Sequence, residues 1–146
     1  MSDVTFTHDS PAWSVLAVSL VCLAGAGLTN SAGVSVQSSV AAILAIVGVF
    51  GIAHVAQTVS RRTLVQLSLG LWVAFIAIAG VHLVGLEAAA ATLPGPVDPL
   101  VAGFTALTWA GLVGAAATTT FLAFREYNAG PAARAVDDPM AEDYEY

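Results

Sequence analysis

The sequence contains no lysine, only one cysteine and very little charge of either sign. Its 146 residues include four arginines and ten acids, so the formal net charge is -6 and charged residues make up 10% of the chain. With so few basic residues there is no patch to neutralise a phosphate backbone, which excludes a nucleic-acid-binding protein. The lone Cys22 can form neither an intrachain disulfide nor a thiolate metal cluster.

Apolar residues dominate the chain instead. They make up 58% of the sequence, with a mean hydropathy of +0.83, which is not the composition of a water-soluble domain. Four runs contain no Asp, Glu, Lys or Arg and are close to the ~20 residues that cross ~30 Å of hydrocarbon as a helix. These runs are residues 12–28, 38–59, 64–86 and 100–124. Alternating segments typical of a membrane barrel are absent, so we predict an all-α bundle of four transmembrane helices.

The remaining segments complete the predicted domain organisation. Residues 1–11 are a short acidic segment, residues 12–128 form the membrane domain, and residues 129–146 form an acidic tail that we expect to be disordered. Ser10 before Pro11, and Asp98 before Pro99, predict the N-caps of the first and fourth helices.

The first apolar run also ends in small residues, as a secretory signal does. Asp3 and Asp9 precede it without any basic residue, whereas a signal peptide carries a positive N-terminal region. We therefore expect the first helix to be retained.

The arginines predict the orientation, because basic residues in short loops stay on the cytoplasmic side. Arg61 and Arg62 separate the second and third apolar runs, and Arg125 and Arg134 follow the fourth. With four helices, all these positions fall on one side of the membrane. We predict that both termini are cytoplasmic in a multi-pass protein of the cell membrane, or of a virion membrane, and that loops 29–37 and 87–98 lie outside.

Acidic residues in the aqueous segments, together with the absence of lysine, resemble the composition of membrane proteins of extremely halophilic archaea. The resemblance is one of composition alone, without shared motifs. It implies a halophilic source and a surface adapted to high salt.

Two histidines, His54 and His82, are the only titratable groups within the spans apart from Cys22, and an ionisable residue at membrane depth is a functional hypothesis. Their positions along the second and third runs separate them by roughly 18 Å across the membrane at ~1.5 Å per residue. One haem iron or metal ion therefore cannot take both from a single chain.

His82 lies near the outer end of the third run, where it could accept a proton or provide a single ligand, with Glu87 and Asp98 as possible partners. It shares helical spacing with Trp72 and Phe75, which suggests an aromatic wall for a quinone or haem. The alternative that we favour is a neutral imidazole packed within the bundle.

His54 precedes Gln57 and Arg61 at helical spacing, and Gln66 follows Arg62 by four residues. The spacing predicts a polar cluster at the cytoplasmic end, which could serve as a lipid-headgroup, quinone or proton-entry site. The plainer alternative is that the long side chains reach the interface and the imidazole bonds a neighbour.

The fourth run carries small residues at every fourth position, a pattern that lets another helix approach closely. Because most of that run is Gly, Ala or Thr, the pattern is only modestly specific, and the partner could be another helix of the chain or a second protomer. The column comprises Ala102, Ala106, Ala110, Gly114 and Thr118.

No catalytic or dinucleotide motif, no metal-ligand motif and no paired carboxylates occur in the spans, so we do not expect an enzyme. The sequence favours a structural or accessory subunit without a cofactor, in a homo-oligomer, a respiratory or transport complex, or a viral envelope. The second hypothesis is a redox subunit that binds haem b or quinone through His54 or His82 with help from a partner chain. A small channel or carrier is the third, because few polar residues could line a path.

Overall fold

The computed structural model describes residues 10–30 and 35–129, which are 90% helical and contain no strand. The four long helices are α1 (Ser10–Thr29), α2 (Val36–Thr58), α3 (Arg61–Val84) and α5 (Val97–Ala129). Each is long and apolar enough to cross a membrane, so the all-α prediction with four candidate spans is confirmed. The expected segment before Ser10 and the tail beyond Ala129, including Arg134, lie outside the described residues.

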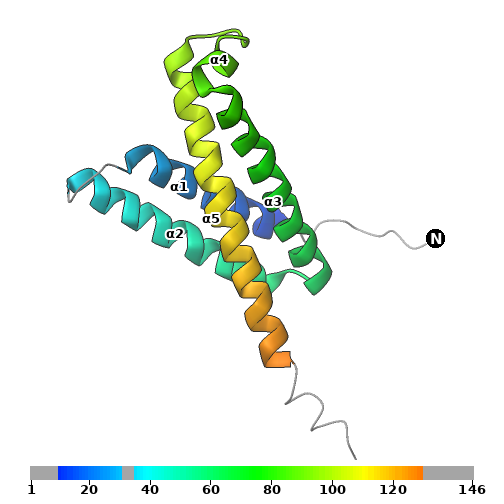
Figure 1. Ribbon diagram of the computed structural model, residues 1–146. Coiled ribbons are helices and arrows are strands. Elements are labelled where there is room, and N and C mark those ends of the chain that lie inside the picture. Colours follow the sequence, from blue (N-terminus) through cyan, green and yellow to red (C-terminus); the bar gives the residue numbers. More distant parts are fainter. Residues whose placement is uncertain (1–9, 31–34, 130–146) are drawn as a thin grey trace, which may run out of the picture.

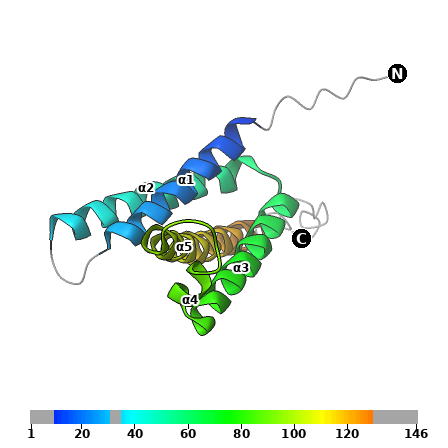
Figure 2. The same cartoon turned by 90° about the horizontal axis from the view of Figure 1, so that it is seen from above.

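The helices form two antiparallel pairs that cross obliquely (Figures 1 and 2). Helix α1 lies along α2, and α3 lies along α5. Helix α5 occupies the centre, where it also contacts α1 and α2, whereas α3 makes no extended contact with either. The bundle is therefore open between α1 and α3.

Several helix ends differ from the sequence prediction. Helix α5 begins at Val97, so Asp98 is an acidic residue of the first turn rather than the N-cap. The short helix α4 (Leu86–Ala90), which we did not predict, lies between α3 and α5. Gly85 joins α3 to α4 with φ of 98°, a left-handed conformation that glycine adopts without the clash of a Cβ atom.

The core lies where α5 packs against the α1/α2 pair. Its fully buried side chains include Leu23 and Ile52, which are 1% and 0% exposed. Gly48 lets α1 and α2 come close, because a Cβ atom there would lie 2.7 Å from Leu23 Cγ. The buried members of the main cluster are Leu16, Leu23, Ile52, Val55, Ala110 and Ala117. None of them belongs to α3, which is held mainly by α5.

Candidate functional site

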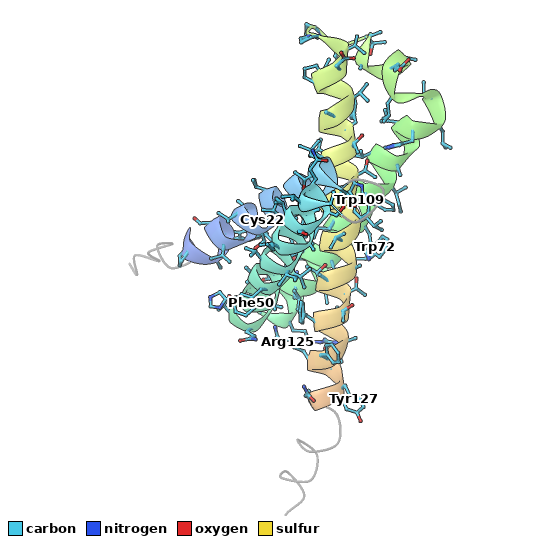
Figure 3. All side chains as sticks on the ribbon, turned by 90° about the vertical axis from the view of Figure 1, so that its left-hand side faces the viewer. Cys22, Phe50, Trp72, Trp109, Arg125 and Tyr127 are labelled. Carbon is cyan, nitrogen blue, oxygen red and sulfur yellow. The ribbon has the colours of Figure 1, made fainter. Side chains whose placement is uncertain are left out.

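The end of the bundle that carries the described arginines is held together by α5. Arg125 donates hydrogen bonds from Nη1 to the carbonyl oxygens of Ala56 and Val59, both at 2.9 Å (Figure 3). These carbonyls belong to the last turn and the C-cap of α2, which lack partners within the helix. A cation here also complements the negative end of the α2 dipole. Arg125 is thus a structural cap.

Arg61 forms an ion pair with Glu126, the residue that follows Arg125 on α5. Because Ser60 is the N-cap of α3, Arg61 belongs to the first turn of α3 and faces α5. Arg62 follows it but makes no ion pair or hydrogen bond with any described residue. The three described arginines therefore lie at one end of the bundle, and Arg62 is the one that pairs with no residue of the described ranges.

The expected polar cluster of His54, Gln57 and Arg61 does not form as predicted. Helix α2 ends at Thr58, and the chain reverses at Val59 and Ser60 before α3 begins. The helical spacing that would align Arg61 with His54 is therefore interrupted, and Arg61 pairs with Glu126 instead.

His54 lines a hollow of about 630 Å³ between the start of α1 and the α2–α3 turn. The imidazole is exposed and makes no hydrogen bond with a described residue. We call this space the His54 hollow; its walls include Pro11, Trp13 and Val15 from α1 and Thr58, Ser60 and Thr63 from the turn. It places a histidine and three hydroxyl groups around one opening.

A second hollow of about 480 Å³ lies next to the first along α3. We call it the Gly70 hollow; it is lined by Trp13, Thr63, Gln66, Leu67, Gly70 and Leu71. The two hollows share the lining residues Trp13 and Thr63 and are therefore adjacent; we call the pair the α1–α3 groove. Its polar part lies at the arginine end, and its apolar part lies along the candidate span of α3.

His82 lies far from this groove, near the other end of α3. It is exposed, and its Nδ1 lies 3.4 Å from the carbonyl oxygen of Ile78 one turn earlier. No hydrogen bond or ion pair joins it to Glu87 or Asp98 among the described residues. His54 and His82 lie on helices α2 and α3, which make no extended contact with each other.

The aromatic residues that precede His82 belong to the α3–α5 interface. Trp72 donates from Nε1 to Thr119 Oγ1 at 3.0 Å, and Ser68 shares the same hydroxyl at 2.8 Å. Phe75 contacts Trp72 edge to face, with ring centroids 5.9 Å apart, and its Cβ would lie 3.3 Å from a Cβ at Gly111. This part of the aromatic stripe therefore packs within the chain.

The small-residue column of α5 also faces the inside of the bundle. Ala106, Ala110, Gly114 and Thr118 are buried, and Ala102 is half-buried. A Cβ atom at Gly114 would lie 3.1 Å from Leu20 of α1 and 3.6 Å from Leu71 of α3. Thr118 bonds back to the carbonyl oxygens of Gly114 and Ala115, so it does not line a polar path.

A further groove of about 730 Å³ between α3 and α5 is almost wholly apolar, and Phe124 contributes to its lining. Trp72 and Tyr127, labelled in Figure 3, also line it. Cys22 is half-buried in α1. Within residues 10–30 and 35–129, no group of three His, Cys, Asp or Glu side chains could hold a metal ion.

Sequence reasoning missed Trp13, which lines both parts of the groove. The available signal was its position two residues after Pro11, in the first turn of a candidate span, because tryptophan is enriched at membrane interfaces.

Comparison with protein-family models, curated proteins and solved structures finds no match to this chain.

Proposed function

We propose that the chain is a non-enzymatic integral membrane protein that serves as a structural or accessory subunit of a membrane assembly. The observation that carries the proposal is the isolation of α3. Only 6% of the most apolar window of α3 is buried, against 22–33% for the other three candidate spans.

The outer face of α3 is a continuous apolar surface. Leu69, Val73 and Ile76 are 60–67% exposed and follow one another at helical spacing. Lipid can cover such a face, but a helix held mainly by one neighbour gains packing contacts when a second chain covers it. The small residues of α5 are already used within the chain, so α3 is the helix we propose as the contact with another copy or another subunit.

Disulfide cross-linking in native membranes tests this proposal. Cysteine placed at Ile76 of α3, in a Cys22→Ala background, should yield a covalent adduct with a second copy or a distinct chain. Ile46 of α2 is similarly exposed, at 69%, and serves as the matched control. A monomer by mass in lipid nanodiscs, together with no adduct from Ile76, Leu69 or Val73, would contradict the proposal.

A redox subunit is the second candidate, and the position of His54 favours it. The imidazole lines an open hollow without a hydrogen-bond partner among the described residues, so it is available as a single ligand. A reduced-minus-oxidised spectrum of the purified assembly should then contain a Soret change that His54→Ala removes and His82→Ala retains. A colourless protein without bound quinone would rule this candidate out.

We also propose that both termini are cytoplasmic. Support comes from the common location of Arg61, Arg62 and Arg125 at the end where α1 begins and α5 ends.

A further inference from the structure

We propose that the α1–α3 groove binds one anionic lipid, with its phosphate at the His54 hollow and an acyl or isoprenoid chain in the Gly70 hollow. This inference does not depend on the proposed accessory function, because it concerns a ligand of the chain itself.

The polar end of the groove offers two hydrogen-bond donors to a ligand. Ser60 Oγ and Thr63 Oγ1 lie 2.8 Å apart and use one hydroxyl proton between them, which leaves the other available. The His54 ring N–H has no partner among the described residues. Two such donors at one opening suit a phosphate, whose oxygens only accept when it is ionised.

The charge at this end is positive among the described residues. Arg62 lies in the first turn of α3 between Ser60 and Thr63, which both line the His54 hollow, and it makes no ion pair with a described residue. Glu126 is the one acid described at this end, and it pairs with Arg61 on the α5 side. The backbone N–H groups of the first turn of α3 add to the attraction for an anion.

The shape of the groove distinguishes a lipid from a soluble phosphate. From Thr63 to Leu71 the groove follows α3 for about 12 Å at ~1.5 Å per residue. Its walls change from hydroxyl groups to Leu67, Gly70 and Leu71 along that path. A Cβ atom at Gly70 would meet nothing within 4 Å, so the space beside it is open. A polar opening beside an apolar hollow matches an amphipathic molecule.

Native mass spectrometry of the full chain tests the proposal, with equal amounts of phosphatidylglycerol and phosphatidylcholine added in mild detergent. We expect one phosphatidylglycerol retained per chain in preference to phosphatidylcholine. Arg62→Gln should weaken retention on the order of tenfold, because it removes a charge-assisted contact. Arg61→Gln changes the net charge equally but lies on the α5 side, and it should retain the lipid.

A second pair of variants tests the apolar part without changing any charge. Gly70→Leu should fill the Gly70 hollow and weaken lipid retention on the order of tenfold, because the lipid chain can no longer bury its methylene groups there. Gly80→Leu adds the same bulk to the same helix, also into open space but outside the groove, and should have no effect. Circular dichroism of each variant confirms that the fold is kept.

Three results would overturn the proposal. Equal retention of both lipids would show that the phosphate end does not select an anion. Equal losses for Arg61→Gln and Arg62→Gln would indicate a general surface charge effect. Displacement of the lipid by inorganic phosphate at equal concentration would identify a soluble phosphate site rather than a lipid site.

Discussion

Arg125 on α5 donates a hydrogen bond to the carbonyl oxygen of Val59, at the point where the chain leaves α2. The same nitrogen reaches Ala56, so one guanidinium serves two carbonyls of another helix. This contact joins the α1/α2 pair to the α3/α5 pair at the end where they are connected by only Val59 and Ser60.

Replacing Arg125 should therefore destabilise the fold, and not only affect the orientation of the protein in the membrane. Arg125→Gln should cost about 1.5–3 kcal/mol, the usual value for hydrogen bonds to a charged group, and lower Tm in nanodiscs by several degrees. Arg125→Lys should recover part of the loss, because it keeps a cation at the end of α2. Arg61→Gln, which removes an arginine whose ion pair with Glu126 is exposed and contributes little, is the control; a similar Tm for all four proteins would contradict the capping role.

Alanine substitution should change the free energy of unfolding in opposite directions at two glycines of the long helices. At Gly48 the new methyl group would meet Leu23 at 2.7 Å and the Ser19 carbonyl oxygen at 2.9 Å, so Gly48→Ala should cost about 1–3 kcal/mol. At Gly70 the space is open, and alanine should stabilise α3 by about 0.5–1 kcal/mol through its helix propensity. Thermal unfolding of both variants in nanodiscs measures the difference. The same sign for both would argue against the close approach of α1 and α2.

The hydrogen bond between Trp72 and Thr119 should be measurable as a coupling between α3 and α5. A double-mutant cycle with Trp72→Phe and Thr119→Val should give an interaction of about 0.6 kcal/mol, typical of hydrogen bonds between membrane helices. Thr119→Val alone should cost more than this, since Ser68 shares the same hydroxyl. Trp109→Phe with Thr119→Val is the reference cycle, and equal couplings in both would refute the contact.

Thiol labelling of sealed cells tests the predicted orientation, and the structure identifies suitable positions. Ser60 caps α3 and Gly95 has φ of 137°, so cysteine at either site would perturb the backbone. Thr92, in the turn between α4 and α5, and Asn128, near the end of α5, are both exposed. In a Cys22→Ala background, Thr92→Cys should react with an impermeant maleimide and Asn128→Cys should not. The reverse pattern would place both termini outside.

The long helices could be predicted from the sequence, because an apolar run long enough to cross a bilayer has few other stable conformations. The N-cap expected at Asp98 was wrong by two residues, since α5 begins at Val97 and the N-cap position is the residue before it. Helix α4 was missed because its five residues, Leu86–Ala90, are too short to give a periodic pattern.

The site was predictable only in part. His54 was identified as a candidate because a histidine within a span is rare, and it does line a hollow. The groove itself depends on how obliquely the two helix pairs cross, which apolar runs without strong periodicity do not encode. From the sequence, Arg125 could be interpreted only as a determinant of membrane orientation. Its capping role was not predictable, because its partners are backbone atoms 66 and 69 residues away.

The close approach of α1 and α2 at Gly48 has a consequence for evolution. Apolar residues on the outer faces can exchange among Leu, Ile and Val with little cost, so most of this sequence is free to drift while the fold persists. Substitution is more restricted at a few positions, namely Gly48 and Gly51 on α2, Gly27 opposite Trp109, and Arg125. Distant relatives should therefore share these few positions and little else.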